Sequence, residues 1–165
     1  MKKFLGIGLV LIMLMSVCLF AVGCDMSTTT DEETEAETVQ TEEQNKLGDF
    51  AVTIESARLA KDYEGKDVVI VKYIFENLND EEGNSFIWAM DDKVFQNGVG
   101  LNKSYFVDDS ANYSSDNQSK EIRKGASIEV EVAYELNDTT TPIEVEVSEL
   151  ISFTDAKVTK TFNLQ

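Results

Sequence analysis

Two segments in the C-terminal part of the chain alternate strictly between apolar and polar residues. In Ala126–Leu136, "ASIEVEVAYEL", the even-numbered positions are all apolar and four of the five odd-numbered positions are polar. "PIEVEVSEL", which starts at Pro142, repeats the pattern with isoleucine and valine on one face and mostly glutamate on the other. A period of two places alternate side chains on opposite faces of a strand. Both segments are therefore predicted to be strands with one face on a core and the other in water.

A third segment, Val68–Phe75, is apolar on both faces. Seven of its eight residues are apolar or aromatic, and only Lys72 interrupts "VVIVKYIF". Such a run is typical of a central strand, here one covered on both faces at one end. Phe50–Leu59 is predicted to be the preceding strand. It is joined to the next through "DYEGKD", in which Gly65 can adopt a positive φ.

Shorter segments complete the strand pattern. Three of them are predicted to be strands: Ser85–Met90, Lys93–Gln96 and Ala156–Leu164. Asn97-Gly98 is a strong hairpin-turn signal, and residues 102–120 are predicted to form a long polar loop. Seven or eight short strands, with turn signals between them and no convincing helix, indicate an all-β fold, an antiparallel β-sandwich.

Three blocks of the sequence resemble a family of Gram-positive lipoprotein domains of unknown function. The blocks are "VVIVKYIFENLNDEEGNSF", "VFQNGVGL" and "KEIRKGASIEVEVAYELND" with the following "PIEVEV", and they cover most of residues 50–150. The resemblance implies an immunoglobulin-like sandwich, similar to that of a secreted mycobacterial immunoprotective antigen. It implies no functional residues, because the matching blocks are patterns of strands and turns.

The N-terminal 23 residues form a long apolar run instead. Lys2 and Lys3 precede nineteen uncharged residues, and the run ends in the small-residue site "AVG". This pattern predicts a secretory signal peptide over residues 1–23. The alternative is an uncleaved membrane helix, since nineteen apolar residues can just span a bilayer. Both interpretations place the rest of the chain outside the cytoplasm, because the lysines stay inside.

The signal is followed directly by a cysteine. "LFAVGC", Leu19–Cys24, resembles the lipobox of bacterial lipoproteins, in which the cysteine receives a diacylglycerol and becomes the first residue. Ala21 stands three residues before the cysteine, where the lipobox usually has a large aliphatic residue. "AVG" would also be a site for ordinary signal peptidase, which would cut at the same bond. Cys18 lies within the signal, so Cys24 would be the one thiol of the mature chain. The resemblance implies lipidation of Cys24, and two acyl chains suffice for stable anchoring.

Residues 24–48 have very few apolar side chains. Asp25–Leu47 contains eight acids, six threonines and one base, Lys46. Such a segment cannot bury enough surface to offset its ordering entropy, so it is predicted to be a disordered linker to a domain over residues 49–165. The alternative is an acidic tail that a basic partner recognises.

Composition excludes several classes of partner and chemistry. Without Lys2 and Lys3 the chain has 12 basic and 31 acidic residues, a formal net charge of −19, and residues 49–165 alone, with 11 and 23, carry −12. Nucleic acid and anionic lipid would be repelled, so the domain is expected to stand away from the membrane surface. The chain has no histidine and the domain no cysteine, which excludes histidine-paired nucleophiles and the usual zinc sites. A carboxylate-dependent glycan hydrolase is a remote alternative. With so many acids in the domain, a pair at a suitable distance is expected by chance, so such a pair would be weak evidence for catalysis.

The loop sequence "DDSANYSSDNQS" raises the question of calcium. Oxygen-bearing side chains stand at its positions one, three, five and nine: Asp108, Ser110, Asn112 and Asp116. An EF-hand also needs glycine at position six and glutamate at position twelve, where Tyr113 and Ser119 stand. The EF-hand pattern therefore fails, and the alternatives are a looser calcium site and a solvated loop.

Glutamates occupy the polar faces of the two alternating strands. If these strands are neighbours, five glutamates share one sheet face: Glu129, Glu131, Glu135, Glu144 and Glu146. Like charges opposite one another destabilise a sheet, so register, lysines, a cation or a basic partner would have to relieve them. Alternatively, the loop 137–142 crosses between sheets and separates the strands. Trp88 is predicted to lie in the core, and exposure in an apolar surround would make it a binding anchor instead.

These patterns together predict a monomeric, lipid-anchored protein on the outer face of the cytoplasmic membrane. Its domain is predicted to be a non-catalytic binding or adaptor module that acts through a strand face or the 102–120 loop. The expected partners are the membrane, through the diacylglycerol on Cys24, and a cell-surface or envelope protein, with no other cofactor and no nucleic acid. The alternative is a structural or accessory subunit of a membrane or cell-envelope complex, which an exposed apolar patch of several hundred Å² would favour.

Overall fold

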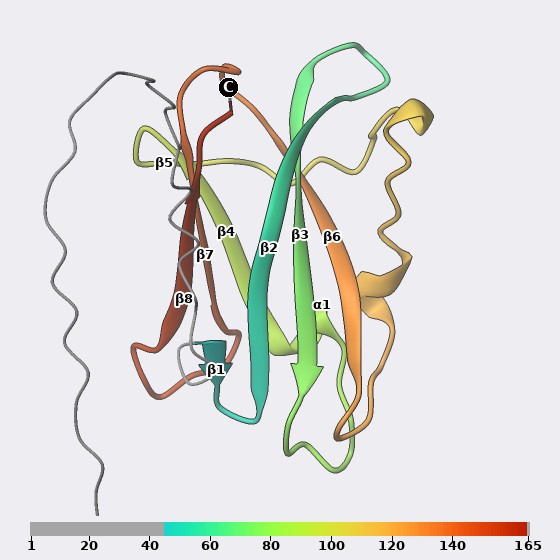
Figure 1. The fold of residues 1–165 in the computed structure, drawn as a ribbon, viewed down its shortest axis with the longest axis vertical. Helices are drawn as coiled ribbons and strands as arrows, with labels where there is room; N and C mark the ends of the chain where they lie inside the picture. Colours follow the sequence, from blue (N-terminus) through green and yellow to red (C-terminus); the bar gives the residue numbers. More distant parts are fainter. Residues whose placement is uncertain (1–44, 165) are drawn as a thin grey trace, which may run out of the picture. The chain divides into compact units, whose positions relative to one another are not determined.

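The computed structural model describes residues 45–164, which form two antiparallel four-stranded sheets packed as a β-sandwich (Figure 1). The first sheet has the strand order β1-β2-β3-β6 and the second β5-β4-β7-β8. The strands of the first sheet are β1 (Lys46–Leu47), β2 (Phe50–Lys61), β3 (Asp67–Asn77) and β6 (Ser127–Glu135). Those of the second sheet are β4 (Met90–Gln96), β5 (Val99–Gly100), β7 (Ile143–Glu149) and β8 (Lys157–Phe162).

The connectivity is that of an immunoglobulin-like sandwich. The chain crosses between the sheets after β3, after β5 and again after β6. The orders β2-β3-β6 and β5-β4-β7-β8 correspond to strands A-B-E and C′-C-F-G of that fold, and residues 101–126 occupy the place of strand D. The predicted all-β, immunoglobulin-like fold is thereby confirmed.

The core lies between the sheets and is built from the inward positions of the period-two pattern. β3 contributes Val69, Val71, Tyr73 and Phe75, and β6 contributes Val130, Val132 and Tyr134. Facing them, β7 contributes Ile143, Val145 and Val147. The ring of Phe75 stacks on Phe50 at 5.3 Å between centroids and meets Phe86 edge-on at 5.7 Å, so an aromatic cluster fills one end of the core.

The outer face of β3 is covered as well, but only near its start. Val68 and Ile70 form a second buried cluster with Ala133 of β6 and Val107 of the long loop. Residues 102–120 therefore fold over the sheet, and this cover explains why the β3 sequence is apolar on both faces. The prediction of a central strand covered on both faces at one end is confirmed.

The same loop protects the free edge of the first sheet. It contains two short 3-10 turns, η2 (Asp109–Ala111) and η3 (Asp116–Ser119). Asn117 Nδ2 donates to Glu129 O at 2.8 Å, and Gln118 Nε2 donates to Glu131 O at 2.6 Å. Side-chain amides thus satisfy carbonyl groups of edge strand β6 that no neighbouring strand reaches among the described residues.

Two sequence-based boundaries differ from the structure. The segment Ser85–Met90, predicted to be a strand, contains one helical turn, α1 (Phe86–Ala89), before β4 begins at Met90. The sandwich also begins before residue 49, because β1 pairs with β2 and Leu47 is buried in the core. Strand pairing and the burial of Leu47 thus attach the C-terminal end of the acidic segment to the sandwich.

The predicted signal peptide, Cys24 and most of the acidic linker lie outside the described residues. Within residues 45–164, no helix has the length and apolar character needed to cross a bilayer. The topology shows that the five glutamates of the two alternating strands do not share a sheet face, because β6 and β7 lie in different sheets. The alternative, a loop 137–142 that crosses between the sheets, is confirmed.

Candidate functional site

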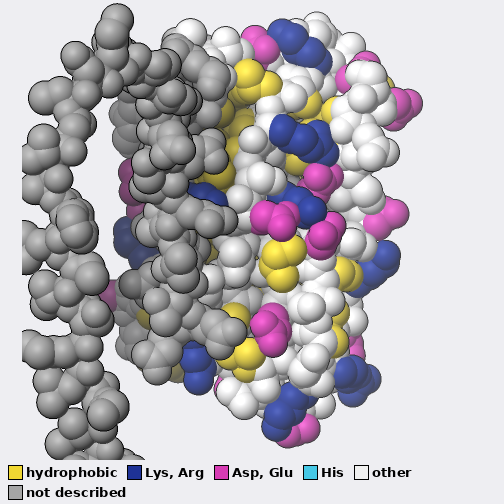
Figure 2. Space-filling view, viewed as in Figure 1, with side chains coloured by type: hydrophobic (Ala, Val, Ile, Leu, Met, Phe, Trp, Pro, Cys, Tyr) yellow, Lys and Arg dark blue, Asp and Glu magenta, His cyan; other side chains and the backbone are white. Residues whose placement is uncertain are grey.

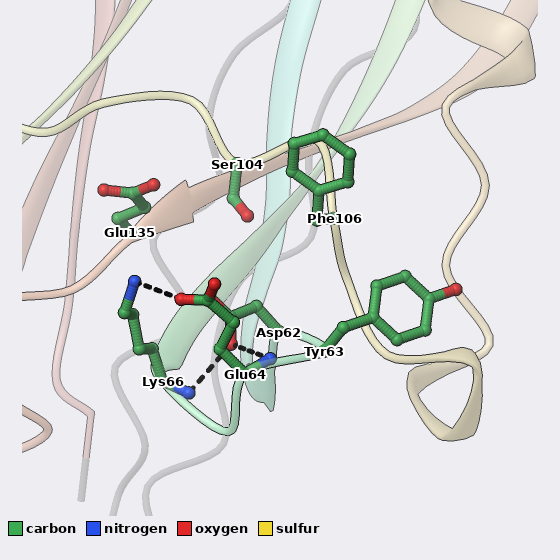
Figure 3. A pocket seen from close by; sticks show the side chains of 7 residues that line it. All are labelled: Asp62, Tyr63, Glu64, Lys66, Ser104, Phe106 and Glu135. Carbon is green, nitrogen blue, oxygen red and sulfur yellow. Dashed lines mark hydrogen bonds and ion pairs between the residues drawn. The ribbon is translucent and has the colours of Figure 1, made fainter.

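A pocket of about 430 Å³ lies at the end of the sandwich opposite β1. Its walls come from the β2–β3 turn, from the start of the long loop and from the end of β6 (Figure 3). Seven residues line it: Asp62, Tyr63, Glu64, Lys66, Ser104, Phe106 and Glu135. The 102–120 loop, one of the two surfaces that the sequence analysis considered for binding, contributes one of these walls.

The β2–β3 turn is shaped by a single carboxylate. Asp62 Oδ1 accepts hydrogen bonds from the backbone N–H of Glu64 and of Lys66, both at 2.8 Å. Gly65 donates to Asp62 O at 3.0 Å and adopts φ +81°, the left-handed conformation that a side chain would oppose. Asp62 therefore fixes the turn, while Lys66 Nζ pairs with Glu64 Oε2 at 2.6 Å across its exposed tip. The Glu64 carboxylate raises the pKa of Lys66.

The opposite wall is held by backbone pairing with two strands. Ser104 N donates to Ala133 O at 2.8 Å, which fastens the loop to β6. Tyr63 N donates to Phe106 O at 3.0 Å, and Asp108 N to Lys61 O at 2.9 Å, which fastens it to the end of β2. The segment 102–108 therefore bridges the first sheet and presents the Ser104 hydroxyl and the Phe106 ring beside the turn (Figure 3).

A buried polar network anchors this segment to the second sheet. Asp92 of β4 is almost fully buried; it accepts a hydrogen bond from the Tyr134 hydroxyl of β6, and Lys103 Nζ lies 2.5 Å from its Oδ1. Burial and the neighbouring Tyr73 and Asp92 raise the pKa of Tyr134 far above its ordinary value, so the phenol stays a donor. The network joins the two sheets and holds the loop at Lys103, the residue next to Ser104 of the pocket wall.

The lining of the pocket combines negative charge with aromatic surface. Asp62, Glu64 and Glu135 are carboxylates against one ammonium group, Lys66. Phe106 is 72% exposed, and Tyr63 extends away from the other lining residues, where its hydroxyl donates to Asp109 Oδ1 at 2.7 Å. Carboxylates beside an aromatic face suit a ligand that carries a cation next to apolar groups.

The four loop residues considered for calcium lie on two separate turns. Asp108 accepts a hydrogen bond from Ser110 N at 2.9 Å. Hydrogen bonds from the side chain and the backbone of Ser110 lower the pKa of Asp108. Asn112 follows in the left-handed conformation, and Asp116 begins η3. In the part of the chain that the structure describes, no three histidine, cysteine or acidic side chains gather closely enough to hold a metal ion.

The strand glutamates are mostly neutralised by neighbouring bases. Lys72 lies 3.0 Å from both Glu55 and Glu129, and Arg58 lies 2.8 Å from Glu131. On the second sheet, Lys157 pairs with Glu146 at 2.7 Å. The face drawn in Figure 2 accordingly shows basic side chains beside acidic ones. Among the described residues, neither Glu135 nor Glu144 has a basic partner within 4.0 Å, and Glu135 lines the pocket.

Trp88 does not lie in the core: its side chain is 71% exposed, so that prediction was wrong. As a strand, Ser85–Met90 would place Phe86, Trp88 and Met90 on one face. In the α1 turn the inward positions are instead Phe86 and Ala89, three residues apart, and Trp88 points outward.

Sequence reasoning missed the pocket residues themselves. Phe106 stands in the short apolar run Tyr105–Val107 within a mostly polar loop, and this departure from loop composition was an available signal. Asp62 could also be found, because an aspartate before "YEGK" is typical of a turn that uses its own side chain. Glu135 carried no signal, since it continues the alternation of its strand.

Two solved structures share this fold. A candidate lipoprotein, YcdA, from Bacillus subtilis is 17% identical with a TM-score of 0.54; the alignment covers 75% of this chain and 39% of that protein. A candidate lipoprotein from Staphylococcus aureus is 20% identical with a TM-score of 0.51, over 72% of this chain and 91% of that one. The chain thus spans about two fifths of the Bacillus protein. No curated protein matches the sequence.

A family model matches residues 25–149, about three quarters of the chain. The match runs through β1 to β7 and includes every residue that lines the pocket. It also agrees with the resemblance carried by the three sequence blocks. This chain belongs to the family described as domain of unknown function DUF5067.

Proposed function

We propose that this protein is a lipid-anchored, extracytoplasmic binding module whose ligand occupies the acidic pocket at the end opposite β1. The observation that carries the proposal is the composition of that pocket: three carboxylates, one ammonium group and an exposed aromatic ring line a volume of about 430 Å³. A volume of this size suits a small ligand or one to three side chains of a larger one. The ligand class that fits is a basic segment of an envelope protein, with lysine or arginine next to an apolar residue.

The proposal is of binding without catalysis. The described part of the chain contains no histidine and no cysteine, so neither an imidazole base nor a thiolate is available there. Of the pocket carboxylates, Asp62 is already occupied by two backbone N–H groups and Glu64 by Lys66. Those two carboxylates therefore have structural partners, and Glu135 is the acid that a ligand would meet.

The pocket is tested by titration with a short peptide. The probe is acetyl-Lys-Phe-Lys-amide, and acetyl-Glu-Phe-Glu-amide serves as the matched control. Amide chemical shifts of residues 62–66, 104–106 and 135 should change with the basic peptide alone. Glu135→Gln and Phe106→Ser should each weaken binding by about five- to twentyfold, since one charge-assisted or cation–π contact is lost.

Glu82→Gln is the control substitution, because Glu82 is an exposed carboxylate in the β3–α1 connection at the other end of the domain. Equal loss of affinity in Glu82→Gln and Glu135→Gln would mean that only overall charge attracts the peptide. Absence of shifts at the pocket residues with either peptide would refute the proposed ligand class.

The anchor is tested separately by intact-mass analysis of the membrane fraction. The wild type should begin at Cys24 and carry the added mass of a diacylglycerol, and Cys24→Ala should lack it. A wild-type protein without acyl mass would end the lipoprotein proposal and leave the pocket proposal standing.

A further inference from the structure

Five large apolar side chains are exposed together at the other end of the sandwich. They belong to α1 and to the β7–β8 connection, and we call them the apolar tip: Ile87, Trp88, Leu150, Ile151 and Phe153. Phe153 is 99% exposed, so nothing in the described chain packs against its ring. Leu150 N donates to Ala89 O at 2.9 Å, and Met90 pairs with Glu149, so the two segments lie side by side.

The apolar tip is free of charge in an otherwise highly charged chain. Residues 84–90 and 150–154 contain no acidic or basic residue, although 27% of the whole sequence is charged. Large aromatic side chains carry roughly 150–250 Å² each, so Trp88 and Phe153 alone expose on the order of 350 Å². The largest apolar patch on a monomeric protein is commonly of this size and is often functional.

The tip lies at the end of the sandwich where the described chain begins. β1, α1 and the β7–β8 connection are all found at the lower end in Figure 1, whereas the β2–β3 turn, which lines the pocket, is at the upper end. Gly48, the residue after β1, touches the second sheet near the tip: a Cβ built on Gly48 would lie 1.9 Å from Glu149 Oε1. Twenty residues separate Asn45 from Cys24. A coil of that length has an expected mean span of about 25 Å.

We propose that the apolar tip inserts into the outer surface of the membrane to which Cys24 is anchored, which directs the acidic pocket away from the bilayer. The inference rests on the lipid anchor proposed above. Exposed tryptophan and phenylalanine side chains, here Trp88 and Phe153, suit the interface between lipid headgroups and acyl chains. The tip thus acts as a second, weak membrane contact beside the lipid.

The small area of the tip favours lipid over a protein partner. A stable protein interface buries about 800 Å² on each side, which exceeds what five partly exposed side chains supply. A tethered contact needs far less intrinsic affinity, because a short linker holds it at an effective concentration in the millimolar range. The overall charge opposes close approach to anionic lipid, so the contact should be strongest on zwitterionic vesicles and should strengthen with salt on anionic ones.

Trp88 is the single tryptophan of the chain and reports on the tip directly. The chain from residue 24 onward, made without lipid, is coupled through the Cys24 thiol to a maleimide lipid in phosphatidylcholine vesicles. Trp88 emission should shift to shorter wavelength, and brominated acyl chains should quench it at least twofold. The variant Ile151→Ser/Phe153→Ser should lose most of both effects at an unchanged thermal midpoint, because both side chains are exposed.

Tyr105→Ser is the matched control: it removes a ring that is 75% exposed in the 102–120 loop, outside the pocket lining, and should keep the vesicle-induced shift and quenching of Trp88 as in the wild type. Wild-type emission that vesicles neither shift nor quench would overturn the proposal, and so would equal quenching in the double variant. A blue shift that appears with rising protein concentration, without vesicles, would assign the tip to a second copy of this chain. Chemical coupling makes these outcomes independent of whether the cell attaches a lipid to Cys24.

Discussion

The ion pair between Lys103 and the buried Asp92 provides the sharpest test of how the loop that forms the pocket wall is held. Lys103→Met removes the ammonium group and keeps most of the apolar stem. At 2.5 Å, unit charges attract by on the order of 7 kcal/mol at an effective dielectric constant of about 20. Desolvation offsets much of this, and the Lys103 side chain is 35% exposed, so the loss should fall below the 3–5 kcal/mol typical of fully buried pairs. We expect about 2 kcal/mol in the free energy of unfolding.

Urea denaturation measures this loss as a fall of roughly 1 M in the midpoint. In an Asp92→Asn background the same substitution should cost less than about 0.5 kcal/mol, because no buried charge is left unpaired. Lys93→Met, at the exposed pair with Asp91, is the control and should cost less than about 0.5 kcal/mol. Equal costs of Lys103→Met in both backgrounds would refute the reasoning. Hydrogen exchange should also quicken at Ser104 N if the pair anchors the loop.

Three further predictions concern the fold. Leu47→Ala should lower the free energy of unfolding by about 2–4 kcal/mol in urea denaturation, because Leu47 is buried in the core, whereas a linker position would give no change. Gly98→Ala should cost about 1 kcal/mol by the same assay, since φ is +74° and no atom lies within 4 Å of the added carbon; a neutral result would show that the turn relaxes. Backbone N–H groups of Thr141 and Thr140 lower the pKa of Asp138 to about 2, so its stabilising contribution is present above about pH 4 and is lost as the pH falls toward 2. The stability difference between wild type and Asp138→Asn should therefore shrink over that range, and a constant difference would contradict the assignment.

The strands were predictable because a strand that is buried on one face has apolar residues at alternate positions of its sequence. Val130, Val132 and Tyr134 point inward, as their period indicates, and Asn97-Gly98 forms the predicted β4–β5 turn. Both residues of that turn adopt positive φ, which only a few residue types tolerate. Local chemistry of this kind needs no knowledge of the rest of the chain.

The remaining features depend on contacts between distant segments. Asp92 reads as an ordinary polar residue in "MDDKVF", yet it is buried because Tyr134 and Lys103 reach it from other elements. Trp88 reads as core by composition, and only the change from strand to helical turn exposes it. The pocket likewise combines residues from positions 62 to 135, which no single stretch of sequence brings together.

The side-chain amides that cap β6 have a consequence for solubility. An open edge rich in valine would accept a strand from another molecule and begin polymerisation. Asn117 and Gln118 occupy carbonyl groups along that edge while offering no backbone ladder of their own. The two amide side chains thus hinder edge strand β6 from pairing with a strand of another molecule.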